Sequence, residues 1–404
     1  MIGSDETIGD RIAHHRKVRR LTQTALAERA SVSVSILRKI EQGSRDATPV
    51  LVAALAKALS VDVSTLNGQP YDRNGRRPDQ IHALMPPLRR ALAYWDVAPA
   101  PETSPRGWGL LEADAREVSR LRQAGQHMQV AARLPALLLE TTARAEDTIG
   151  GERERYFEIL TVLLFAAHSV TYKTGYEDLS TVVEDRLVWA SAQSSDPLMQ
   201  ALAAWARTTS LLRAGAYDVG QTLLERAQAD VDVRVDGSAG QYMAGSLHLR
   251  GAILAARAGD AQSAETHLVE ARNLADRAGA DSNGGWYQLT FGPSNVGVHD
   301  VATAIELGDG PTALNRAEPL RLASGFPAIR AGHHYMDLAR AYLWQGRNDR
   351  ALACLYRARE LAPQQTRHHP TTREVLRMLV RAHRQANEPL ARFSAWVGMV
   401  KAPE

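Results

Sequence analysis

Residues 21–43 place two short helical patterns side by side with almost nothing between them. Thr22 and Ser33 are hydroxyl residues of the kind that cap helix N-termini, and apolar residues at helical spacing follow each of them. Only Ser31 and Val32 separate the end of the first pattern from the second cap, so the two helices must cross steeply. This stretch therefore predicts a helix-turn-helix.

The second predicted helix leaves a polar face free. Its apolar stripe consists of Ile36, Leu37 and Ile40. The remaining face carries small, hydroxyl and basic side chains, namely Val34, Ser35, Arg38 and Lys39. A short helix with such a face has the size and chemistry to enter the major groove of DNA.

The pattern resembles the phage-repressor-type (Xre) helix-turn-helix domain over about residues 8–66. The resemblance rests on the joint spacing of Gln23, Ala27, Val32, Ser33, Ile40, Glu41 and Gly43. It implies a five-helix domain, residues 1–68, that binds a double-stranded DNA operator. The family usually has glycine in the inter-helix turn where this chain has Ser31, so a positive φ at Ser31 is expected to cost about 1 kcal/mol.

The same resemblance implies which side chains meet DNA. It places Gln23 on a phosphate, and it makes Arg45, after the recognition helix, a backbone contact. It directs Val34, Ser35 and Lys39 toward base edges. The full expected DNA-binding set is Gln23, Thr24, Ser33, Val34, Ser35, Arg38, Lys39 and Arg45.

Composition bounds the rest of the chain. A length of 404 residues exceeds one ordinary core, and two or three domains are expected. Only 6% of residues are aromatic, which favours helices over sheets. A net charge of +3 is too small to indicate non-specific binding of nucleic acid over the whole protein surface. The single Cys354, the polar start of the chain and the lack of a bilayer-length apolar run predict a cytoplasmic protein without membrane contact.

Residues 69–107 are predicted to be a linker with one short helix. Residues 69–78 are basic and lack apolar periodicity, and residues 98–105 form a stiffer, proline-rich segment. Between these two segments, Pro86 and Pro87 are expected to prevent a helix from starting before Pro87.

Residues 108–404 contain a degenerate internal repeat. Its clearest copy, residues 332–363, pairs two helical patterns around the turn glycine Gly346 and resembles a tetratricopeptide (TPR) unit. Weaker copies are marked by Gly125, Gly175, Gly215, Gly259 and Gly308. The repeats predict an all-α fold in which a TPR-like α-solenoid of about six helical pairs ends in a capping helix near residues 371–386.

The inner helices of such a solenoid line a concave groove. Aligning the turn glycines predicts that aromatic, amide, imidazole and guanidinium groups face inward, as a ligand groove requires. Asn295 could hold a peptide backbone, and Arg213 or Arg340 could clamp a carboxylate. The inward positions of a repeat array can also be ordinary polar surface that binds no ligand, and this alternative stays open. The predicted groove residues are Phe165, Ser169, Tyr172, Lys173, Trp205, Thr209, Arg213, Asn295, His299, His333, Asp337, Arg340 and Trp344.

Residues 286–299 are the least repeat-like part of the solenoid. Ser294 is expected to cap a new helix that places Asn295 and His299 one turn apart on one face. The stretch is either a bent entry to the groove or a long loop against the solenoid, and the loop is slightly favoured.

Nothing in the chain indicates catalysis, a cofactor or a metal site. The histidine pairs at 14–15 and 368–369 lack the spacing and partners of a zinc site. Phosphate-binding glycine loops, nucleophile elbows and paired catalytic carboxylates are also missing.

The leading hypothesis is a sequence-specific transcriptional regulator. An Xre domain joined to a TPR-like solenoid is similar to large actinobacterial regulators and to peptide-sensing quorum regulators of Gram-positive bacteria. That resemblance implies a homodimer and a small effector, either a peptide or a small molecule. One short recognition helix buries too little surface for tight binding, which also favours a dimer. The alternative is a TPR interaction scaffold or antitoxin-like protein with a DNA tether.

Overall fold

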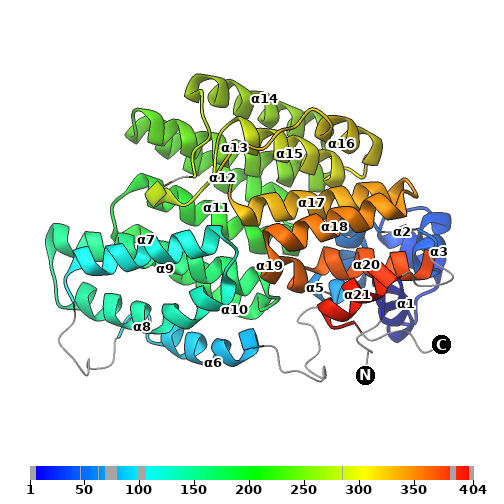
Figure 1. The fold of residues 1–404 in the computed structure, drawn as a ribbon, viewed down its shortest axis with the longest axis horizontal. Helices are drawn as coiled ribbons and strands as arrows, with labels where there is room; N and C mark the ends of the chain where they lie inside the picture. Colours follow the sequence, from blue (N-terminus) through cyan, green and yellow to red (C-terminus); the bar gives the residue numbers. More distant parts are fainter. Residues whose placement is uncertain are drawn as a thin grey trace.

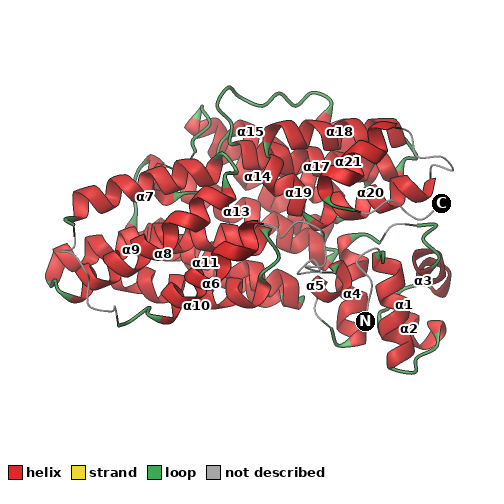
Figure 2. Ribbon diagram, turned by 60° about the horizontal axis from the view of Figure 1, so that its bottom comes forward, coloured by secondary structure: helices red, strands yellow, loops and turns green. Residues whose placement is uncertain are grey.

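The computed structural model describes residues 6–45, 47–61, 63–68, 80–97, 106–283, 285–382 and 388–399. Within these ranges the regular elements are helices, apart from an isolated bridge between Ser282 and Phe291 (Figures 1 and 2). The predicted all-α fold class is confirmed. None of the described helices combines the length and apolar character needed to cross a bilayer.

The described part of residues 6–68 forms the five helices that the resemblance implies. They are α1 (Ile8–Val18), α2 (Gln23–Arg29), α3 (Val34–Glu41), α4 (Pro49–Leu59) and α5 (Val63–Asn67). Thr22 and Ser33 cap α2 and α3, because their hydroxyl oxygens accept from backbone N–H groups at 3.0 and 3.2 Å. Ser31 has φ 54°, the left-handed conformation expected of this turn.

Six helical hairpins follow among the described residues, each turning at one of the six predicted glycines. The pairs are α7 (Trp108–Gln123) with α8 (His127–Glu146), α9 (Gly150–Lys173) with α10 (Glu177–Gln193), α11 (Pro197–Ala214) with α12 (Tyr217–Arg234), α13 (Ser238–Ala258) with α14 (Ala261–Ala278), α15 (Pro293–Glu306) with α16 (Gly310–Ala317), and α17 (Ala328–Trp344) with α18 (Asn348–Leu361). The turn glycines have φ between 69° and 81°, which glycine adopts without a Cβ clash. The prediction of about six helical pairs is confirmed.

The first helices of the hairpins form a closed ring of contacts. Each packs on the next from α7 to α17, and α17 returns to contact α7 (Figure 1). At this closure, the backbone N–H of Met128 donates to Gln364 Oε1 at 2.9 Å. The inner face is therefore the wall of a chamber, whereas the repeats alone predicted an open groove.

Helix α6 (Gln80–Ala93) runs through Pro86 and Pro87, so the prediction that no helix starts before Pro87 is wrong. Each proline removes a backbone donor, but α6 packs against α8 and α10. This packing buries Ile81, Met85 and Leu88 almost completely. Tertiary burial therefore outweighs the local preference. The flanking linker segments predicted at 69–78 and 98–105 lie outside the described residues.

Three further helices complete the described C-terminal part. They are α19 (Pro363–His368), α20 (Pro370–Ala382) and α21 (Glu388–Val397). Helix α20 corresponds to the predicted capping helix, whose expected end at residues 383–386 lies outside the described ranges. Helix α21 was not predicted, and it buries Leu390 and Phe393.

The segment before α15 is partly ordered into a short 3-10 helix, η1 (Gly285–Tyr287). Helix α15 starts at Pro293 with Gly292 as its N-cap, so the expected cap at Ser294 is wrong. The backbone N–H and hydroxyl of Ser294 instead donate to the carboxylate of Asp281. Asn295 and His299 do lie one turn apart, as predicted, and are joined through the Asn295 carbonyl at 2.9 Å.

Candidate functional site

The predicted DNA face of α3 is not covered by the other described parts of the chain. Ser35, Arg38 and Lys39 are exposed, and Val34 is half-buried at the start of the helix. The other exposed residues of the predicted set are Thr24, Ser33 and Arg45. Figure 2 shows α3 at the margin of the molecule, away from the hairpins. This geometry leaves the helix accessible to a DNA groove.

Gln23 lies beneath this face in a network that joins the first three helices. Its amide nitrogen donates to Glu41 at 2.8 Å. Glu41 also accepts two hydrogen bonds from the guanidinium of Arg16, at 2.7 and 2.8 Å. These bonds and the charge of Glu41 raise the pKa of Arg16. Gln23 therefore positions α3 relative to α2. The sequence predicted only a phosphate contact for Gln23 and did not indicate this structural role.

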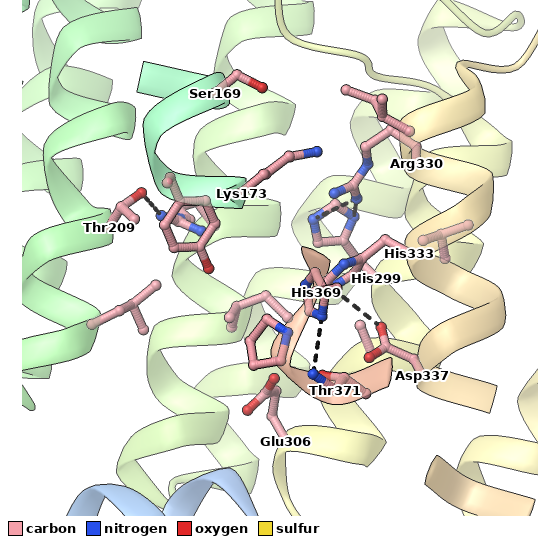
Figure 3. A pocket seen from close by; sticks show the side chains of 18 of the residues that line it. Ser169, Lys173, Thr209, His299, Glu306, Arg330, His333, Asp337, His369 and Thr371 are labelled. Atoms are coloured by element: carbon pink, nitrogen blue, oxygen red, sulfur yellow. Dashed lines mark hydrogen bonds and ion pairs between the residues drawn. The ribbon is translucent and has the colours of Figure 1, made fainter. Parts of the chain in front are cut away.

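A cavity of about 330 Å³ lies inside the ring of first helices (Figure 3). Side chains of α7, α9, α11, α13, α15 and α17 line it, together with the start of α20. The helix-turn-helix domain also supplies part of the wall, through Ile8, Ala47, Val52, Ala53, Val63 and Asn67. The DNA-binding domain thus covers one side of the chamber.

Helix packing, one turn contact and one salt bridge fix the helix-turn-helix domain on this opening. Helices α4 and α5 contact α11, and α4 also contacts α13. Thr48 lies against Gly308, the turn glycine between α15 and α16. Arg381 of α20 pairs with Asp10 at 2.9 Å and lies on Gly43, directly after the recognition helix.

All the predicted groove residues except Trp344 line this cavity. They come from α9, α11, α15 and α17, which the turn-glycine register placed correctly at the inner face. Trp344 instead lies against Gly310 of α16, with the Arg340 guanidinium 5.0 Å from its ring centroid. Ligand contact by the other residues remains a prediction.

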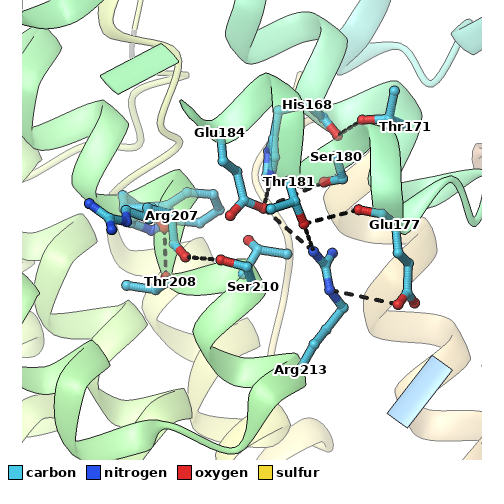
Figure 4. A network of polar contacts seen from close by, with 12 residues as sticks. His168, Thr171, Glu177, Ser180, Thr181, Glu184, Arg207, Thr208, Ser210 and Arg213 are labelled. Atoms are coloured by element: carbon cyan, nitrogen blue, oxygen red, sulfur yellow. Dashed lines mark hydrogen bonds and ion pairs between the residues drawn. The ribbon is translucent and has the colours of Figure 1, made fainter. Parts of the chain in front are cut away.

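Asn295 and Arg213, which were predicted to hold a peptide backbone and a carboxylate, already have partners within the protein. The amide oxygen of Asn295 accepts from Arg330 at 2.9 and 3.1 Å, and its nitrogen donates to the Thr290 carbonyl at 2.6 Å. Arg213 lies 3.7 Å from Glu177 and 3.8 Å from Glu184 (Figure 4). Asn295 is therefore placed to orient Arg330, and the charge of Arg213 is compensated.

Comparisons with known proteins match the N-terminal part of the chain. A family model described as a helix-turn-helix domain matches residues 7–67. The immunity repressor protein of Bacillus phage phi105 is 41% identical over 97 residues, which cover 22% of this chain and 67% of that repressor. The chain belongs to the phage-repressor-type helix-turn-helix family. It is a DNA-binding regulator.

A solved structure also aligns with most of this regulator. It is that of Bacillus thuringiensis PlcR in complex with the peptide PapR7 and DNA. The alignment covers 89% of the regulator and 96% of PlcR, at 10% identity and a TM-score of 0.21. Because that score is low, no property of PlcR is transferred to the regulator.

Several cavity residues of the regulator were missed from its sequence. They are Arg122, Arg250, Arg257, Glu306, Arg330, His369 and Thr371. For two of these residues, the spacing in the sequence could have predicted an inward position. Arg330 lies one turn before His333 on the same helical stripe, and Arg257 precedes Gly259 by two residues, as Arg213 precedes Gly215.

The chamber carries more positive charge than its carboxylates balance. Arg257 pairs with Glu306 at 2.9 and 3.2 Å. In contrast, five other lining cations form no salt bridge with any described carboxylate, namely Arg122, Lys173, Arg250, Arg330 and Arg340. Burial lowers the pKa of Arg122, Arg250 and Arg330 to about 10. Burial, with the nearby charges of Arg330 and Arg122, lowers the pKa of Lys173 to about 7.

The histidines of the chamber are neutral at pH 7. Burial and neighbouring cations hold the pKa values of His299 and His333 well below their ordinary value. The same causes lower the pKa of His369 to about 3. The histidines therefore add hydrogen-bonding groups to the chamber without adding charge.

Proposed function

We propose that this regulator controls transcription by binding a specific operator through α3 and by sensing a small effector inside the ring. The observation that carries this proposal is the shared wall of the cavity, to which Ile8, Val52 and Val63 of the DNA-binding domain contribute. An occupant touches both the ring and the DNA-binding domain. Its binding free energy therefore depends on how the two are docked, which is the condition for coupling.

The proposed mechanism is a population shift in a homodimer. An effector that favours one docking of the DNA-binding domain alters the spacing of the two recognition helices relative to major grooves about 34 Å apart. Moving such an equilibrium from 1:99 to 99:1 takes about 5.5 kcal/mol of differential binding. An occupant enclosed by several helices and by the DNA-binding domain can supply that difference.

The size of the chamber favours a small molecule over an extended peptide. Its volume of about 330 Å³ is at the lower end of the usual range for ligand pockets. The closed ring also argues against the scaffold alternative, because the described inner face offers no open groove to a partner helix.

Replacing Lys39 or Ser35 with alanine is expected to weaken binding to a preferred DNA duplex about tenfold or more, since each side chain faces the major groove. The preferred duplex is obtained by selection from a random library with the full chain, and affinity is measured by fluorescence anisotropy across salt concentrations. Arg226→Ala, on the exposed surface of α12, is the matched control and should change nothing. A flat salt dependence contradicts the DNA proposal. So does a Lys39→Ala variant that discriminates selected from unrelated duplexes as strongly as the parent does.

A disulfide between positions 48 and 308 should abolish effector control. A Cβ at Gly308 would lie 3.7 Å from Thr48 Cβ, which suits a disulfide. A side chain at φ 81° is strained, and the reduced protein controls for that strain because it carries the same substitutions. The Thr48→Cys and Gly308→Cys substitutions are made in a Cys354→Ser background. In the reduced protein, a small-molecule extract that raises the melting temperature should change DNA affinity, whereas in the oxidised protein it should not. Equal responses in both states would contradict coupling through domain docking.

A further inference from the structure

We propose that the effector is a small organic anion whose carboxylate or phosphate group binds between Lys173 and Arg330, with Arg122 beside them. This inference rests on the proposed function, because it names the chemical class of the effector. It is carried by the hydrogen-bond partners of these three cations, which are neutral groups among the described residues.

Arg122 is the most deeply buried of these cations, with 5% of its surface exposed. One terminal nitrogen donates to the backbone carbonyl of Gln288 at 3.0 Å and to the Gln288 side-chain oxygen at 3.2 Å. Its Nε has no hydrogen-bond partner. The face of its guanidinium lies 5.0 Å from the ring centroid of Phe165. Arg122 thus lines the cavity with a guanidinium whose hydrogen bonds to described groups go only to Gln288.

Lys173 and Arg330 come from α9 and α17, the two helices that flank α7 in the ring, and point toward one another (Figure 3). The Lys173 amine donates to Gln365 at 3.1 Å. The Arg330 guanidinium is held by Asn295, and one of its nitrogens lies 3.2 and 3.3 Å from the ring nitrogens of His299. Two cations are therefore held face to face with only neutral partners.

Such an arrangement is costly without an anion. Removing a cation from water carries a penalty of several kcal/mol, which neutral hydrogen-bond acceptors offset only in part. A carboxylate or phosphate between the two side chains would accept charge-assisted hydrogen bonds from both and offset that penalty. Asp337 also lines the cavity, and burial raises its pKa to about 7, so it is only partly ionised at neutral pH.

The rest of the chamber suits an apolar body attached to that anion. Phe165, Leu249 and Val298 line it, and Trp205 is covered by the Arg250 guanidinium at 4.5 Å. Arg250 donates to the hydroxyls of Thr208 and Thr209 at 2.6 and 2.7 Å, which leaves its other terminal nitrogen for a ligand. Aromatic carboxylates and aryl phosphates combine these features.

Anion affinity should decrease as the pH rises from about 7 to 9. The pKa of Lys173 is about 7 in the folded protein against 10.5 unperturbed, so the amine loses its proton in this range. An anion binds the protonated amine better. In the same range the unfolded chain binds more protons than the folded one, so the stability contribution of Lys173 increases with pH. The groups that face Lys173 are Arg122, His127, Arg330, His333, Gln365 and His369.

The test is calorimetry and thermal unfolding of the full chain with phenyl phosphate, benzoate and neutral benzamide at matched ionic strength. Phenyl phosphate or benzoate should stabilise the protein, and benzamide should not. Lys173→Met and Arg330→Met should each weaken anion binding about tenfold or more. Arg226→Met is the matched control and should bind like the parent. Retained binding to the selected DNA duplex shows that the variants fold.

The outcomes separate this inference from the proposed function. Equal stabilisation by benzamide and the anions, no anion binding, or anion binding that survives both substitutions would overturn the anion proposal. Which of the two anions binds more tightly distinguishes carboxylate from phosphate. Anion binding that requires Lys173 and leaves DNA affinity unchanged would support the anion site and contradict its role as an effector site.

Discussion

Replacing Glu41 with alanine is expected to destabilise the DNA-binding domain by about 3–5 kcal/mol, since it leaves a buried guanidinium without its counter-ion. The side chains of Glu41 and Arg16 are only 6% and 12% exposed. The substitution also removes the acceptor of Gln23, so α1, α2 and α3 lose their common polar contact. Hydrogen exchange measured by mass spectrometry should show faster exchange across residues 8–41 and little change in the hairpins.

Arg38→Ala is the control for this effect, because Arg38 is exposed on the same helix and has no described salt bridge. It should leave exchange rates unchanged while weakening DNA binding. Glu41→Gln should be intermediate, since an amide keeps one acceptor and loses the charge. Unchanged exchange in the Glu41→Ala variant would show that the Arg16 charge is compensated in some other way.

The second large effect is expected where α13 meets the segment before α15. Phe291 is fully buried, and a Cβ at Gly245 would lie 2.0 Å from its ring. Phe291→Ala is expected to cost about 3–5 kcal/mol by leaving a cavity. Gly245→Ala is expected to cost about 1–3 kcal/mol by displacing the ring. Both are measured as changes in the free energy of unfolding in urea.

The double substitution should cost less than the sum of the two, because the new methyl group enters the space that the ring has left. A coupling of about 1–3 kcal/mol is expected for such direct contact. Gly151→Ala serves as control, since a Cβ there meets nothing within 4 Å and alanine favours the helix by about 0.5–1 kcal/mol. Additive costs would indicate that the segment around Phe291 moves independently of α13.

The Phe291 segment also connects stability to the chamber. It joins Ser282 through the isolated bridge and leads into α15, which carries Asn295 and His299. Gln288, which holds Arg122, lies three residues before Phe291. The sequence interpretation slightly favoured a loop tucked against the solenoid for this stretch. In the structure this stretch also lines the cavity, through Gln288, Leu289 and Thr290.

Features set by local chemistry were predictable from the sequence. Thr22 and Ser33 cap helices because their hydroxyls reach backbone N–H groups three residues away. The six turn glycines were predictable because a helical hairpin turns through a left-handed residue. The same glycines fixed the helical register, and the register placed residues such as Lys173 and His333 on the inner face. Those properties depend on neighbours within about two helical turns.

Features that depend on distant residues were decided only by the tertiary structure. The amino-acid sequence determined the helix-turn-helix, the hairpins and the inward-facing side chains. It did not determine that α6 passes through Pro86 and Pro87, since the compensating burial comes from α8 and α10. Nor did it determine that α17 closes on α7, that Val52 faces the chamber, or that Arg122 and Arg330 form no salt bridge with a described carboxylate. The physical reason is that burial and charge pairing arise between segments that are far apart in the chain. Helix caps and turns, in contrast, form between residues of a single short segment.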